Sequence, residues 1–332
     1  MSRAKGKNIT RRSKDTYRLT YENMISLAFF KKIMPNLTFE NTPMGHNHLS
    51  PPKGWKGALD VHGVVRLYPD EVWGESGPPK RLFQKLSDAI DRLNELKLPT
   101  WLIVCSEEAK SLFRTMTNIV CAGTKKGGYE DISDYAVIGV SRSGKGWIPH
   151  RDRDSLENAF DSDGFPNYIT AWMPLTDAST DNSCLYFIPK DYDPTFRDED
   201  KSHFTDALTE PESYQNIIAM PVEAGGMLSF ASRTIHWGSR PLSWIEGHSR
   251  EYIPRKAISL AIARKVFESP ALARKDAAMA PTFLESVVLA ASNALRYEKQ
   301  HALTSSEKEC FTRIVKENAD LLNASYREQL FL

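Results

Sequence analysis

The sequence predicts a mainly β protein with flanking α-helices, built on a double-stranded β-helix, or jelly roll. The middle of the chain consists of short apolar runs separated by Gly, Pro, Asn and Asp, which is typical of antiparallel barrels and jelly rolls. Both flanks show helical periodicity instead. The candidate strands number about eight, as a jelly roll requires: 134–141, 147–151, 168–175, 184–189, 217–222, 226–230, 234–237 and 255–263.

The chain of 332 residues is long enough for one large domain or two small ones. We predict a single domain over 16–332, with a helical N-terminal part (16–133), the jelly-roll core (134–265) and C-terminal helices (266–332). Residues 1–15 are basic with almost no apolar residues, so we expect a disordered tail. Nuclear import or RNA contact is the alternative interpretation of this tail.

The N-terminal part contains several predicted elements. A helix from Thr20 should end before Pro35, and Asp60–Leu67 has the pattern of a strand. Pro79 should open an amphipathic helix, and Ser106 should cap another. Their core-facing residues would be Leu82, Leu86, Ile90 and Leu93 in the first and Leu112, Phe113, Met116 and Ile119 in the second.

The C-terminal part returns to helical periodicity after Pro281. Thr304 and Glu307 have the spacing of a capping box, which marks the start of a last long helix. We expect these helices to brace the barrel. The alternative is that they form the interface of a homodimer, so the chain is predicted to be a monomer or a homodimer through these helices.

Composition excludes several function classes. The net charge of +1 argues against a protein that coats nucleic acid. The sequence has no apolar run of membrane-spanning length and no secretory signal, so no membrane partner is expected. The four cysteines lack the spacing of a zinc site or a disulfide framework. They indicate a reducing compartment, and we predict a cytoplasmic protein.

His150 and Asp152 are the first candidate site residues. Two positions apart on a strand, they point to the same side, where an imidazole and a carboxylate can share one metal ion. His236 would complete the two-histidine, one-carboxylate face that binds non-haem Fe(II). For the tripeptide alone, a strand histidine beside a surface aspartate is the alternative. His46 and His48 have the same spacing, but their polar loop favours solvent-exposed side chains.

An ordered set of motifs surrounds these residues. It comprises Trp147-Ile148-Pro149-His150-Arg151-Asp152, Ala171-Trp172-Met173-Pro174-Leu175-Thr176-Asp177, Cys184-Leu185-Tyr186-Phe187-Ile188-Pro189, Gly225 to Phe230, His236, and Arg255-Lys256-Ala257-Ile258-Ser259. Over about residues 134–263 this order resembles the phytanoyl-CoA dioxygenase family of Fe(II)/2-oxoglutarate oxygenases. Departures are Ser183 in place of a glycine, Lys190-Asp191-Tyr192 in place of Gly-Ser-His, and Gly226 in place of an aspartate.

The resemblance implies Fe(II), 2-oxoglutarate and O2 as cofactor and co-substrates. The distal carboxylate of 2-oxoglutarate needs a fixed cation, and the planar fork of an arginine suits it. Arg255 is our candidate, with Ser259 on the same strand face and Trp172 beside the co-substrate. Arg250, in the polar loop before that strand, is the competitor. Trp172 as simple core filling, and Arg255 as a strand-edge surface charge, are the alternatives.

The implied reaction is oxidation of a substrate C–H bond, with hydroxylation as the expected outcome and succinate and CO2 as co-products. Two alternatives from other classes remain: a cupin-like metal-binding barrel without 2-oxoglutarate, and a scaffold barrel without activity. An arginine paired with a serine argues against the first, and an intact triad argues against the second.

The substrate pocket is predicted near Trp147, Trp237 and Arg240, with the loops 191–216 and 238–252 as covers. Aromatic walls suit an apolar body, and Arg240, with Arg151 and Arg153 nearby, suggests that an anionic group is also held. The alternative is that these arginines are surface charges paired with neighbouring acids. We predict a small or medium carboxylate-bearing metabolite, since a lidded barrel favours a substrate it can enclose.

Overall fold

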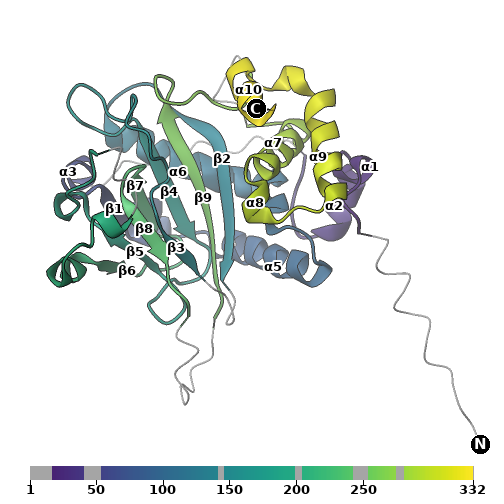
Figure 1. Cartoon of the computed structure of the whole chain (residues 1–332). Helices are drawn as coiled ribbons and strands as arrows, with labels where there is room; N and C mark the ends of the chain where they lie inside the picture. Colours follow the sequence, from purple (N-terminus) through teal and green to yellow (C-terminus); the bar gives the residue numbers. More distant parts are fainter. Residues whose placement is uncertain are drawn as a thin grey trace, which may run out of the picture.

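Two antiparallel sheets form the centre of the computed structural model, which describes residues 17–40, 54–140, 146–198, 204–241, 253–273 and 280–331 (Figure 1). The main sheet has the order β1-β7-β4-β9-β2, and the minor sheet has the order β3-β8-β5-β6. The strands are β1 (Val64–Leu67), β2 (Tyr129–Val140), β3 (Trp147–His150), β4 (Tyr168–Pro174), β5 (Leu185–Ile188), β6 (Ile218–Met220), β7 (Met227–Ala231), β8 (Ile235–Gly238) and β9 (Arg255–Arg264).

The inner faces of the two sheets pack against each other. Trp172 and Phe230 of the main sheet share an apolar cluster with Leu185 and Phe187 of the minor sheet. The rings of Phe187 and Phe230 meet edge to face, with centroids 5.3 Å apart. Together with the flanking helices, this double layer confirms the predicted mainly β class, and two packed antiparallel sheets agree with a double-stranded β-helix core.

Helices cover the outer face of the main sheet. The predicted amphipathic helices are α5 (Lys80–Leu96) and α6 (Glu107–Thr124), and α6 contacts β2, β4 and β9. Phe113 of α6 stacks on Tyr135 of β2, with ring centroids 4.3 Å apart. The Ser106 hydroxyl accepts the Ala109 backbone N–H at 3.2 Å, which confirms the predicted N-cap of α6.

The C-terminal helices lie beside the β2 edge of the main sheet, as Figure 1 shows in yellow. The Thr304 hydroxyl accepts the Glu307 N–H, and the Glu307 carboxylate accepts the Thr304 N–H, so the predicted capping box is present. The helices of this part are α7 (Phe283–Arg296), α8 (Glu298–His301), α9 (Ser305–Glu317) and α10 (Ala324–Phe331), with a short 3₁₀ helix at Ala319–Leu321.

Two sequence predictions for the N-terminal part are wrong. The single helix after Thr20 is divided into α1 (Tyr21–Met24) and α2 (Leu27–Ile33), because the Ser26 hydroxyl accepts the Phe29 N–H and starts a second helix. The strand predicted from Asp60 begins only after α3 (Trp55–His62). Gly63, with φ of 71°, ends α3, and only then does β1 pair with β7.

The remaining short elements connect these layers. Among the described residues, none of the helices combines the length and apolar character needed to span a membrane. The short elements are α4 (Pro69–Trp73) and the 3₁₀ helices at Gly74–Ser76, Thr100–Cys105, Lys190–Tyr192, Phe204–Asp206 and Pro211–Asn216.

Two helical glycines give a matched test of the packing between α3 and α6. A Cβ at Gly123 would lie 2.6–2.9 Å from ring atoms of the buried Trp55, whereas one at Gly57 would meet nothing within 4 Å. Gly57→Ala should therefore stabilise the protein by about 1 kcal/mol through helix propensity. Gly123→Ala should instead destabilise it by about 1–3 kcal/mol through overpacking.

Urea unfolding of the two variants and the wild type measures both effects. Equal stabilisation by both substitutions would contradict the close contact between Trp55 and α6.

Candidate metal centre

The register between β3 and β8 places His150 directly opposite His236. Asp152 follows two residues later and points to the same inner side. Its Oδ1 lies 3.7 Å from the His150 Nε2 and 3.6 Å from the His236 Nε2. One ligand atom from each residue lies within 4.8 Å of the others, so the trio could hold one metal ion. The structure thus brings together the three side chains that the sequence singled out.

Backbone carbonyls orient both histidines. The His150 Nδ1 lies 2.8 Å from the Ile148 carbonyl, and the His236 Nδ1 lies 3.1 Å from the Thr234 carbonyl. A carbonyl oxygen only accepts, so each Nδ1 carries the proton and donates it. Each Nε2 then presents its lone pair toward Asp152, which is the tautomer that an Nε2-ligated metal requires.

The two oxygens of Asp152 have different surroundings. Oδ1 faces the histidines, whereas Oδ2 accepts the hydroxyl of Thr170, a buried residue of β4. The Asp152 backbone N–H donates to the Ser232 carbonyl at 2.9 Å. One carboxylate oxygen is thereby fixed and the other is left for a metal. Sequence reasoning missed Thr170, which precedes Trp172 by two positions on the same strand face.

His236 lies in an apolar part of this centre. Its ring centroid is 4.4 Å from that of Phe230 and 5.8 Å from that of Phe187. Burial lowers the pKa of His236 to about 4, against the opposing effect of the Asp152 charge. A neutral imidazole is the form that binds a metal.

Arg255, the first residue of β9, is buried on the inner side of the barrel. One guanidinium nitrogen donates to the Ser183 carbonyl, and the guanidinium carbon lies 5.7 Å from the centroid of the Trp172 ring. Its Nη1 and Nη2 lie 3.2 and 3.4 Å from the position that a Cβ of Gly238 would occupy. The guanidinium thus lies against the inner face of β8, where a side chain at 238 would crowd it.

Gly238 is therefore a site residue that sequence reasoning missed. The available signal was a glycine inside a strand, which often marks the close approach of another group. Gly238 and His236 are two apart on β8, so both face inward with about 7 Å between them. The Arg255 guanidinium and the metal-facing imidazole are consequently neighbours along one strand.

Trp172 and Ser259 face each other across β4 and β9 on the same inner surface. Both are buried. The indole Nε1 of Trp172 has no hydrogen-bond partner among the described residues, although it is shielded from solvent. An unpaired buried N–H costs about 1–3 kcal/mol, so this donor is suited to a bound acceptor.

Ser183 occupies a backbone conformation that favours glycine. Its φ is 78°, in the left-handed region, and its hydroxyl donates to the Ser239 carbonyl. The family motif has glycine at this position, and this chain retains the geometry with a serine. The left-handed turn presents the Ser183 carbonyl to Arg255.

Arg151 and Arg153 correct one part of the substrate-pocket prediction. They alternate with the ligand candidates and point away from them: Arg151 is paired with Asp193 at 2.7 Å. Arg153 is paired with Asp134 at 2.9 Å and with Glu268 at 3.0 Å. Both guanidinium groups are engaged by structural carboxylates, so the prediction that they attract an anionic substrate is wrong.

Trp237 follows His236 on β8 and so faces the outer side, where it stacks on Tyr186 with ring centroids 5.7 Å apart. Its part in the predicted substrate pocket stays a prediction. Trp147 is about half exposed, with its ring centroid 5.9 Å from that of His150, and Arg240 is exposed beyond the end of β8.

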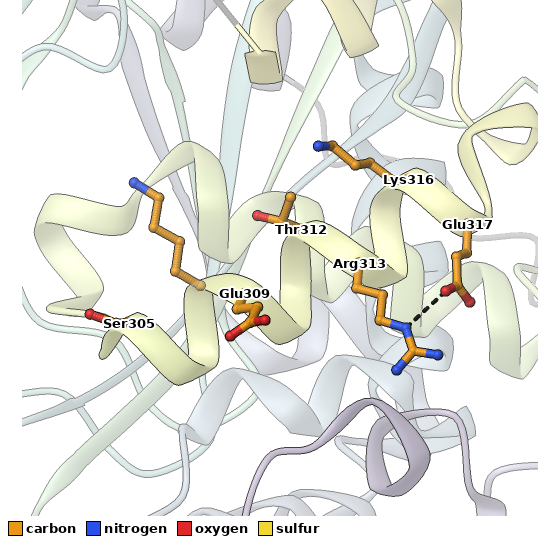
Figure 2. Close-up of a pocket in the computed structure, with 7 residues that line it drawn as sticks. Ser305, Glu309, Thr312, Arg313, Lys316 and Glu317 are labelled. Carbon is orange, nitrogen blue, oxygen red and sulfur yellow. Dashed lines mark hydrogen bonds and ion pairs between the residues drawn. The ribbon is translucent and has the colours of Figure 1, made fainter.

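Some predicted residues lie outside the described part of the chain: His46, His48 and Arg250, with most of the loop 238–252. A pocket lies along one face of α9 (Figure 2), and α9 lies on the other side of the main sheet's β2 edge from β3 and β8 (Figure 1). Its lining consists of Ser305, Lys308, Glu309, Thr312, Arg313, Lys316 and Glu317, and Arg313 donates to Glu317 at 2.8 Å. This polar helix surface contributes nothing to the metal centre.

Several solved structures are similar in fold. AviO1 from Streptomyces viridochromogenes Tue57 has a TM-score of 0.49 and 15% identity, over 71% of this chain and 100% of that chain. The non-heme alpha ketoglutarate dependent carbocyclase SnoK from nogalamycin biosynthesis has a TM-score of 0.47 and 15% identity, over 67% of this chain and 87% of that chain. EctD from S. alaskensis, with 2-oxoglutarate and 5-hydroxyectoine, has a TM-score of 0.44 and 12% identity, over 69% of this chain and 83% of that chain. No residue role follows from likeness at this level.

A match to a protein family is more informative than these structures. Residues 87–243 match the phytanoyl-CoA dioxygenase (PhyH) family, and no curated protein sequence matches the chain. The matched segment contains β3 and β8 with the whole trio of ligand candidates. Two imidazoles and one carboxylate on one face are the donor set of non-haem Fe(II) oxygenases. Residues 87–243 of this chain are thus similar to the PhyH family, and the trio within them has the donor set of a non-haem Fe(II) site.

Proposed function

We propose that this chain is a PhyH-like, non-haem iron dioxygenase that uses 2-oxoglutarate, hydroxylates a C–H bond of a small or medium carboxylate-bearing metabolite, and releases succinate and CO2. The observation that carries the proposal is the convergence of His150, Asp152 and His236 on one point, with both Nε2 lone pairs facing Asp152. We also propose a single domain over 16–332. A cytoplasmic location is consistent with four free cysteines.

The trio would hold Fe(II) through the two Nε2 atoms and the Asp152 Oδ1. The donor set fits the ion, because three ligands on one face leave positions for a bidentate 2-oxo acid and O2. When bound, iron and 2-oxoglutarate would activate O2, the oxidant, with one oxygen atom going to succinate as the 2-oxo acid loses CO2 and the other to the substrate C–H bond. The chain orients the ligands through Thr170 and the backbone carbonyls, while Phe187 and Phe230 exclude water beside His236.

The co-substrate would lie along the inner face of β8. The separation of about 7 Å between the His236 and Gly238 positions suits a five-carbon dicarboxylate that reaches from the metal to Arg255. Arg255 would pair with the distal carboxylate. The unpaired indole N–H of Trp172 and the hydroxyl of Ser259 are the neutral donors on the same surface.

The substrate would enter on the side of Trp147 and Arg240. Trp147 offers an exposed aromatic surface beside His150. With Arg151 and Arg153 engaged in structural ion pairs, Arg240 is our candidate for a substrate anion.

The first prediction separates the metal site from the co-substrate site. Alanine at His150, Asp152 or His236 should weaken Fe(II) binding sharply and abolish turnover. Arg255→Ala should retain Fe(II) but raise the 2-oxoglutarate requirement about thirtyfold or more, since it removes a charge-assisted pair from a buried site. Anaerobic titration with Fe(II), followed by 2-oxoglutarate, measures both through the weak visible charge-transfer band that needs both.

Lys256→Met is the matched control for the arginine. Lys256 is also buried on β9, but it faces outward and pairs with Asp91 of α5 at 2.5 Å. The Lys256→Met substitution should lower the free energy of unfolding and leave the 2-oxoglutarate requirement unchanged. Fe(II) binding without any effect of 2-oxoglutarate in the wild type would favour the cupin-like barrel, and failure to bind Fe(II) would favour a scaffold.

The second prediction concerns the substrate anion. A metabolite library assayed for succinate release identifies a substrate. Arg240→Ala should then raise the KM for that substrate, because one ionic contact is lost. Decay of 2-oxoglutarate without substrate should remain as in the wild type. An unchanged KM would remove Arg240 from the pocket.

A further inference from the structure

Arg151 lies between two proposed metal ligands and is anchored on the opposite side of the strand. Its side chain and that of Asp193 are both 0% exposed. The Arg151 Nη1 donates to the Asp193 Oδ2 at 2.7 Å, and the Arg151 Nη2 donates to the Asp193 Oδ1 at 3.3 Å. The fork also donates to the hydroxyl of Thr195 at 2.8 Å and to the carbonyl of Arg233. This pair is fully enclosed.

The segment that carries Asp193 is itself rigidly held. The Asp193 Oδ1 accepts the backbone N–H and the hydroxyl of Thr195, at 3.0 and 2.8 Å. The buried Arg233 guanidinium donates to the carbonyls of Thr195, Phe196 and Asp198. Asp193 therefore presents a fixed carboxylate, held within the first part of the predicted cover 191–216.

The ligand segment needs such an anchor. β3 is a four-residue edge strand that pairs only with β8 in the described sheet, and its register shifts between Trp147 and His150. Asp152 lies beyond the last paired residue. Edge strands with few ladder hydrogen bonds define side-chain positions weakly, so a buried ion pair next to both ligands adds a constraint to the contacts of Asp152 with Thr170 and Ser232.

We propose that Asp193 is a positioning residue of the metal centre, which acts through Arg151 to fix His150 and Asp152 in ligating geometry. The inference rests on the proposed metal site. Asp193 directly follows the stretch 190–192, so the anchor comes from the loop after β5.

The test compares single and double variants at this pair. Asp193→Asn and Arg151→Met each leave a buried partner uncompensated and should lower stability. The double variant Arg151→Met/Asp193→Asn removes both charges, retains the acceptor for Thr195, and should recover most of the lost stability. Fe(II) dissociation constants and the Fe(II)/2-oxoglutarate band are measured anaerobically for each, beside urea unfolding.

If Asp193 positions the metal ligands, stability and Fe(II) affinity should respond differently in the double variant. The double variant should unfold much like the wild type, yet its Fe(II) dissociation constant should remain about 10- to 100-fold higher. Recovery of both stability and Fe(II) affinity would mean that the pair is structural only and would overturn the proposal. A wild type without Fe(II) binding would overturn the proposed function as well.

A second buried ion pair serves as the control. Glu107 and Lys110 of α6 lie 2.8 Å apart, with both side chains 4% exposed, on a helix that carries no ligand. Glu107→Gln and Lys110→Met should lower stability without a change in Fe(II) affinity. Equal weakening of Fe(II) binding by the control variants would overturn the positioning role.

Arg151→Lys decides the question if the neutral variants do not fold. It keeps the buried charge but loses the two-pronged contact with Asp193. We expect a folded protein with weakened Fe(II) binding and a shifted band. Wild-type Fe(II) affinity and an unchanged band in this variant would contradict the proposal.

Discussion

The antiparallel pairing of β3 with β8 is the constraint on which the site depends. It sets His150 opposite His236, so two imidazoles from distant parts of the sequence meet across one antiparallel strand pair. The residues that follow His150 alternate between inward and outward positions. The inward ones face the metal position, and the outward arginines are held by buried acids from other elements. A slip of one residue in this register would exchange the two sets.

The fold was largely predictable because the period of the apolar pattern changes along the chain. The turn residues delimit β4, β5, β7 and β9 to within a residue or two, and Ser106 and Thr304 mark helix starts by side-chain chemistry. The sequence could not reveal that the apolar run at 60–67 is divided between helix and strand. In a short window of sequence, His62 and Val64 both fit the same predicted strand. In the structure the helix ends at Gly63, and β1 begins to pair with β7 directly after it.

Only the parts of the site that follow from residue spacing or from the order of motifs could be predicted. Spacing two apart put His150 and Asp152 on one side, and the order of motifs pointed to His236 and Arg255. Contacts between segments that lie far apart in the sequence could not be predicted. Thr170 supports Asp152 from another sheet, and the place of Asp193 depends on a loop turn. Trp237 shows the limit of proximity in sequence, because the residue next to a ligand on a strand points to the opposite face.

Gly238 also bears on how selectivity for a 2-oxo acid could change during evolution. Arg255 reaches β8 from β9, which belongs to the other sheet, so its guanidinium is placed by the packing of the two sheets and by the length of the arginine side chain. Any side chain at 238 would occupy the space that the guanidinium now fills. In the proposed site, the glycine and the arginine together therefore limit the length of the 2-oxo acid that fits between the metal position and the guanidinium.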